Sequence, residues 1–86
     1  MKQFDYTIHN PLGMDIRRIG LLAKLANRYA DTTITIAKGN QTAKANQLTR
    51  MMCLAVKCGD KIVVTVDGPA ESNAFFNTRV FFENNL

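Results

Sequence analysis

The chain has 86 residues, of which 47% are hydrophobic, and its formal net charge is +4 at pH 7. This apolar content is typical of a globular fold and excludes a disordered chain. A chain of this length is expected to form one domain over residues 1–86, with a single modest core. No segment is apolar over the length of a membrane span, and the first ten residues lack the apolar region of a secretory signal, so a cytoplasmic location is expected.

Several classes of site are disfavoured by what the sequence lacks. The spacing of Cys53 and Cys58, the only cysteines, fits neither a CxxC redox pair nor a zinc site. We expect two free thiols, with at least one in the core, and we expect neither a metal nor a cofactor. Phosphate-loop and dinucleotide motifs are absent. Nucleic acid is a disfavoured partner, because no RNA-binding aromatic motif, Gly-x-x-Gly clamp or helix-turn-helix pattern accompanies the positive charge.

The first predicted element is a strand in which Phe4, Tyr6 and Ile8 alternate with polar residues. A period of two indicates a strand with one buried face. After a break at residues 10–13, an amphipathic helix is predicted over residues 16–29. Its apolar residues recur at the spacing of one helix face: Ile19, Leu22, Ala23, Ala26 and Ala30.

Two strands and a short helix are predicted next. The segment 32–37 places Ile34 and Ile36 inward, and a tight turn leads into a short strand over residues 41–45. Asn46 is a favourable N-cap for the helix that follows. The apolar spacing of that helix is again that of one face, made by Leu48, Met51, Met52 and Ala55.

The last two predicted elements are a strand over residues 61–67 and a helix that starts at residues 67–69. Pro69 suits the first turn of a helix, where a proline removes no hydrogen bond. The core stripe of this helix is predicted to be Ala74, Phe75, Thr78, Phe81 and Phe82. The order β-α-β-β-α-β-α predicts an α+β fold of two layers, with a four-stranded antiparallel sheet and three helices on one face.

The start of the first helix breaks a local rule. Asp15 is a favoured N-cap residue, but Arg17 and Arg18 follow it directly. Cations at the N-terminus of a helix oppose the helix dipole. Sites that break such rules are often functional sites. The one role that the sequence suggests for Arg18 is an ion pair with Asp15.

The element order and local signatures resemble HPr, the histidine-containing phosphocarrier family of the bacterial sugar phosphotransferase system. The family motif reads Gly, apolar residue, His, Ala, Arg, Pro, and residues 13–18 read Gly-Met-Asp-Ile-Arg-Arg here. Residues 54–59, 63–68 and 84–86 are also similar to the family. The resemblance covers the whole chain and implies the HPr-like open-faced sandwich.

The departures from the family concern its chemistry. In HPr proteins the histidine takes a phosphoryl group from Enzyme I and passes it to sugar-transporter domains. Asp15 stands at that position, Arg18 replaces the proline, and Arg17 keeps the phosphoryl-stabilising position. The family's regulatory serine falls on Asn46 or Gln47, depending on the alignment. Neither has a hydroxyl group, and Thr49 is only a remote substitute.

Three interpretations of Asp15 stay open. It caps the helix, it imitates a phosphorylated histidine beside Arg17 with a permanent negative charge, or it accepts a phosphoryl group itself as an acyl phosphate. His9, the only histidine, lies on the polar side of the first strand. It is expected to be a surface residue, and the family's histidine role is not transferred to it.

A basic stripe on the first helix is the candidate docking surface. Arg17, Lys24 and Arg28 share one helix face, with Gly20 beside them. HPr proteins dock through this face and an apolar patch on the short second helix, which here would contain Leu48, Met51 and Met52. A solvated basic face with core methionines is the alternative.

The resemblance implies a binding or regulatory module rather than an enzyme. The chain is similar in this respect to the catabolite-repression HPr-like proteins, which also lack the histidine. The expected partners are Enzyme I, transporter domains or a transcriptional regulator. Two alternatives stay open: a phosphocarrier that uses Asp15, and a basic nucleic-acid-binding or structural protein that reuses the fold.

Overall fold

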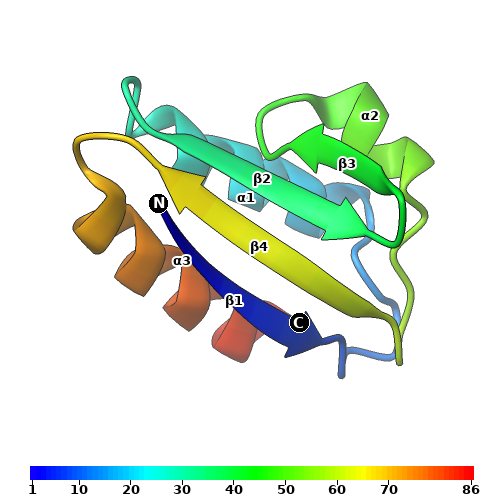
Figure 1. The fold of residues 1–86 in the computed structure, drawn as a ribbon. Coiled ribbons are helices and arrows are strands. Elements are labelled where there is room, and N and C mark those ends of the chain that lie inside the picture. Colours follow the sequence, from blue (N-terminus) through cyan, green and yellow to red (C-terminus); the bar gives the residue numbers. More distant parts are fainter.

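A computed structural model describes residues 1–86 (Figure 1). Its elements follow the predicted order β-α-β-β-α-β-α. In chain order they are β1 (Lys2–Thr7), α1 (Ile16–Asn27), β2 (Thr33–Lys38), β3 (Gln41–Lys44), α2 (Leu48–Cys53), β4 (Lys61–Asp67) and α3 (Glu71–Asn85).

The four strands form one antiparallel sheet in the order β1-β4-β2-β3. α1 and α3 run along one face of this sheet, α2 lies near its β3 edge, and the other face is open (Figure 1). The predicted fold class, a two-layer α+β sandwich with an antiparallel sheet, is confirmed. α1 contacts both α2 and α3, so it is the helix from which side chains reach both neighbours.

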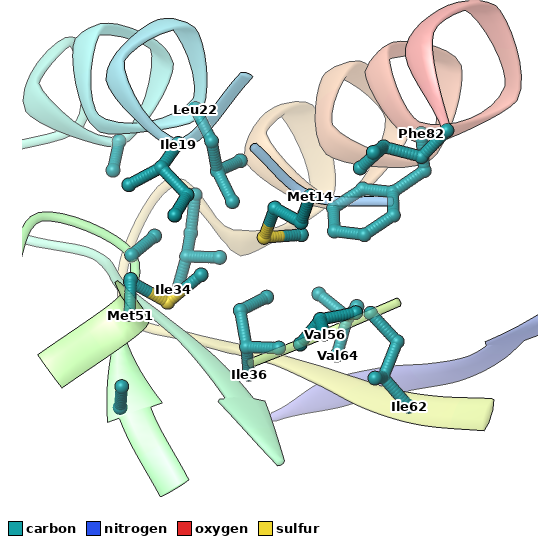
Figure 2. Close-up of a cluster of buried hydrophobic side chains, with 14 of the residues drawn as sticks. Met14, Ile19, Leu22, Ile34, Ile36, Met51, Val56, Ile62, Val64 and Phe82 are labelled. Carbon is teal, nitrogen blue, oxygen red and sulfur yellow. The ribbon is translucent and has the colours of Figure 1, made fainter. Parts of the chain in front are cut away.

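The core lies between the sheet and the helices, because alternate strand residues point to the helical face. Val64 is opposite Phe4 on one side and Ile36 on the other, and all three are buried. Figure 2 shows Val64 and Ile36 facing Ile19 and Leu22 of α1. The period-two pattern therefore identified the buried face of the sheet correctly.

The predicted core stripe of α3 is confirmed. Ala74, Thr78 and Phe82 are fully buried, and Phe75 and Phe81 are partly buried against the cluster. The ring of Phe82 lies edge-on to the rings of two residues on β1, at centroid distances of 5.9 and 5.4 Å. α3 is therefore held on the sheet by an aromatic cluster, in which such edge-on geometry is favourable.

Two helices are shorter than the sequence predicts. α1 ends at Asn27 because the N–H groups of Arg28 and Tyr29 bond to carbonyls three residues earlier, which tightens the last turn. Ala30 is consequently exposed, and Leu25 is buried instead. The last helix, α3, begins at Glu71 rather than at residues 67–69.

The late start of α3 has a local cause. Gly68 has a φ of 145°, which is incompatible with a helix. The N–H of Ala70 donates to the hydroxyl of Thr32 at 3.0 Å, so the loop before α3 is tied to the start of β2. A built side chain at Gly68 would lie 2.6 Å from the backbone of Thr32, which explains glycine at this close approach.

Two smaller expectations are wrong. Asn46 does not cap α2: the cap position is Gln47, and no side chain bonds to the free N–H groups there. The side-chain oxygen of Gln47 instead accepts the N–H of Lys44. Both Cys53 and Cys58 are exposed, so neither is in the core.

Candidate functional site

The candidate site is built on the turn that leads into α1. The N–H of Gly13 bonds to the carbonyl of Asn10, and Gly13 has a φ of 66°. A side chain at Gly13 would lie 2.7 Å from the carbonyl oxygen of Val56, and the same oxygen accepts the N–H of Met14. The close approach of two loops therefore fixes the backbone immediately before Asp15.

Asp15 is the N-cap of α1, as predicted. One carboxylate oxygen accepts the backbone N–H of Arg18 at 3.0 Å, and the other accepts its guanidinium at 2.9 Å. The backbone N–H of Arg18, and after it the guanidinium, hold the pKa of the Asp15 carboxyl below its ordinary value of 3.8. Asp15 is therefore ionised at neutral pH, with each oxygen bound by Arg18.

Arg18 joins the start of α1 to the end of α3. Besides its ion pair with Asp15, its Nε donates to the carbonyl of Asn85 at 3.0 Å. The side-chain amide of Asn10 donates to the same carbonyl. The ion pair was an expectation from sequence. The contact with Asn85 was not foreseen, because local spacing carries no signal for two residues 67 positions apart.

Arg17 has different surroundings from Arg18. It is exposed and has no ion-pair partner. It lines a shallow depression of about 490 Å³, which we call the Asp15–Met52 surface and which is formed by Met14, Asp15, Ile16, Arg17, Ile19 and Met52. Ile16 is 74% exposed. Sequence reasoning did not select Ile16, although an apolar residue off the buried stripe of an amphipathic helix is a signal for contact with a partner.

The residues of the predicted docking surface are distributed over several environments. Met52 and Leu48 are 45% and 48% exposed, as a docking role requires. Met51 is 1% exposed, and Figure 2 shows it in the buried cluster, which corrects its expected place on the surface. Adjacent residues of an α-helix are rotated by about 100° from each other, so Met51 faces the core while Met52 faces solvent. Gly20 is half-buried on α1.

Lys24 does not line the Asp15–Met52 surface. Together with Arg28, it lines a separate groove between α1 and α3. The predicted basic stripe is therefore present on α1, but its residues contribute to two different surfaces.

The two candidate regulatory positions also differ. Gln47 is half-buried and its side chain is bonded to the backbone of Lys44, whereas Asn46 and Thr49 are exposed.

His9 is exposed, as expected, with its ring edge-on to Tyr6 at 5.8 Å. No three side chains of His, Cys, Asp or Glu converge as a metal site would require. None of the helices has the length and apolar character that spanning a membrane demands.

Comparison with known proteins extends over almost the whole chain. The family model PTS-HPr, described as the PTS HPr component phosphorylation site, matches residues 2–84. The phosphocarrier protein HPr of Mycoplasma genitalium is 25% identical over 85 residues, and this match covers 99% of the chain and 97% of that protein.

Solved structures show the same fold. The crystal structure of HPr-C-His from Thermoanaerobacter tengcongensis matches with a TM-score of 0.89 at 24% identity, over 96% of this chain and 92% of that one. A phosphocarrier protein HPr from Bacillus anthracis matches with a TM-score of 0.85 at 25% identity, over 94% and 95% of the two chains. With the sequence motif, the fold and the family model in agreement, the chain belongs to the HPr phosphocarrier family of the phosphotransferase system.

Proposed function

We propose that this protein is a binding or regulatory module of the phosphoenolpyruvate-dependent sugar phosphotransferase system, and that it does not carry phosphate on histidine. The observation that carries the proposal is the environment of Asp15. The family motif aligns this residue with the phosphoryl-accepting histidine, and both of its oxygens are bonded to Arg18. A carboxylate held in this way offers a fixed negative charge at a helix N-terminus instead of a nucleophilic imidazole.

The proposed docking surface is the Asp15–Met52 surface together with Leu48. Arg17 is an exposed cation without an internal partner, and exposed Ile16 and Met52 lie in the same depression. Arginine, methionine and large apolar side chains are favourable at the centre of a protein interface, and methionine adapts to partners of different shape. The proposed partners are the proteins of the relay, Enzyme I and transporter domains, or a transcriptional regulator of the same system. A cytoplasmic location belongs to the proposal.

Regulation by a kinase at the start of α2 is not part of this proposal. Asn46 and Gln47 have no hydroxyl group, and the Gln47 side chain is bonded to the backbone of Lys44. In the proposed module, regulation depends on its concentration and its partners rather than on phosphorylation at Asn46 or Gln47.

A phosphorylation assay tests the absence of transfer. The protein is incubated with phosphoenolpyruvate and Enzyme I, and its intact mass is measured beside that of the Asp15→His variant. We expect no phosphoryl group on the natural chain. The variant regains an imidazole at the head of α1 beside Arg17, so we expect it to gain the mass of one phosphoryl group.

The chemistry of any added group distinguishes the alternatives. A phosphoryl group on the natural chain that hydroxylamine removes would identify Asp15 as an acyl-phosphate carrier and would overturn the proposal. The Arg17→Ala variant of the Asp15→His protein is the matched control. It should accept phosphate more slowly, because it lacks the cation next to the acceptor.

A further inference from the structure

The second surface of interest is the groove between α1 and α3, which we call the α1–α3 groove. It has a volume of about 450 Å³. Leu25 and Phe81 form its apolar base, and Leu21 and Val80, which are both more than one-third exposed, form its edges. Exposed apolar edges over an apolar base are suited to burying an apolar side chain of another molecule.

The charged side chains that line the α1–α3 groove are all positive. Lys24 and Arg28 line it from α1, and asparagines line it from α3. Neither cation has an ion pair or a side-chain hydrogen bond within the molecule, and no acidic residue lines the groove. Two unpaired cations beside an apolar depression are complementary to a segment that carries both carboxylates and an apolar side chain.

The spacing of the cations limits the occupant further. Lys24 lies in α1 and Arg28 is the C-cap of the same helix, four residues on, which places their backbones about 6 Å apart along the helix axis. In an extended peptide, two residues that flank a third are separated by a similar distance, roughly 6.6 Å. Alternate residues of an extended peptide project to the same face. A segment of the pattern apolar–x–acidic–x–acidic can therefore bring one carboxylate to each cation and its apolar side chain toward Leu21, three residues before Lys24.

We propose that the α1–α3 groove binds a short acidic segment of a partner protein, with a carboxylate at each of Lys24 and Arg28 and an apolar side chain between Leu21 and Val80. A nucleic acid suits the groove less well. Two cations neutralise few phosphates, and the only aromatic ring at the base, Phe81, is half-buried and cannot serve as an open stacking platform. This proposal concerns a different surface from the phosphotransferase docking surface and stands independently of it.

Selection from a displayed library of short random peptides on the purified chain is the test. We expect enrichment of segments in which a large apolar residue and two acidic residues occupy alternate positions. A selected peptide is then synthesised beside its isosteric form, with glutamine for glutamate and asparagine for aspartate, and the affinity of each is measured by calorimetry. The neutral form should bind about tenfold more weakly or worse.

Variants locate the binding surface. Arg28→Glu and Val80→Asp should each weaken peptide binding by about tenfold, and Lys24→Gln should weaken it less. Met52→Asp on the Asp15–Met52 surface is the matched control and should leave the affinity unchanged. Because all four residues are exposed, these variants should fold, and circular dichroism checks this. The proposal is overturned if the library shows no acidic enrichment, if Met52→Asp abolishes binding, or if RNA binds more tightly than the acidic peptide.

Discussion

Arg17 and Arg18 are adjacent in sequence but have opposite roles in the structure. The side chain of Arg18 is bonded to Asp15 and to the carbonyl of Asn85, whereas Arg17 is exposed. A cation at the start of α1 is unfavourable with respect to the helix dipole. The two charge-assisted bonds of Arg18 offset this cost. The unusual pair of cations thus combines a structural residue with one that is free to contact a partner.

The link between Asp15 and Arg18 predicts how stability depends on pH. The pKa of Asp15 is lowered in the folded state, so its contribution to stability is fully present above the ordinary value of 3.8 and is lost as pH falls through the lower folded value. Asp15→Asn keeps a good N-cap but removes the charge. We expect this variant to unfold at lower urea concentration than the natural chain at pH 7, with a difference that shrinks steadily below pH 4.

A second aspartate provides the control for this measurement. Asp5 forms an exposed ion pair with Lys61 at 3.5 Å. Exposed pairs of this kind contribute little, so Asp5→Asn should leave the urea midpoint nearly unchanged at every pH. A constant difference between Asp15→Asn and the natural chain from pH 7 to pH 3 would contradict the role assigned to the Asp15 charge.

At the scale of elements, α1 is positioned by a contact between two loops. The carbonyl of Val56 accepts the N–H of Met14, and Gly13 leaves no room for a side chain there. Gly13→Ala combines left-handed strain with overlap against Val56, so we expect it to lower the free energy of unfolding by about 3 kcal/mol. Urea denaturation measures this change.

Gly39→Ala is the matched control for this prediction. Gly39 has a φ of 60°, close to that of Gly13, but nothing lies within 4 Å of the position of a built side chain. The control should cost only the backbone strain, about 1 kcal/mol. Equal losses in the two variants would show that the contact with Val56 does not hold the loop before α1.

The strands and α1 could be predicted from sequence, because their apolar residues repeat with one clear period. The signals for α2, a helix of only six residues, were weaker. Its spacing marked both Met51 and Met52 as apolar-face residues, and only the packed structure shows that the first is buried and the second exposed. Ala55, just after α2, has a φ of 50°, a conformation that nothing in the identity of an alanine indicates.

The candidate site could be predicted only in part, because only some of its contacts join residues close together in the sequence. Asp15 as a cap and its ion pair with Arg18 depend on residues three apart, and local spacing is sufficient to predict both. The Asn85 contact and the separation of Lys24 from Arg17 depend on where α3 packs. Long-range packing of this kind cannot be obtained from the spacing of residues along one helix.

For the molecule as a whole, α1 separates two surfaces of different composition. The Asp15–Met52 surface is shared with α2, and the α1–α3 groove is shared with α3. We propose that the exposed residues of α1 determine what binds on either side of the HPr fold. The proposed function requires that the protein binds proteins of the relay without accepting their phosphoryl group.

Competition in a reconstituted relay tests that requirement most directly. Enzyme I, an HPr with an intact histidine and a transporter domain are supplied with radiolabelled phosphoenolpyruvate, and increasing amounts of this protein are added. We predict that sugar phosphorylation slows while no label appears on this protein, and that the Met52→Asp variant inhibits much less. Undiminished sugar phosphorylation at large excess, or label on the natural chain, would contradict the account.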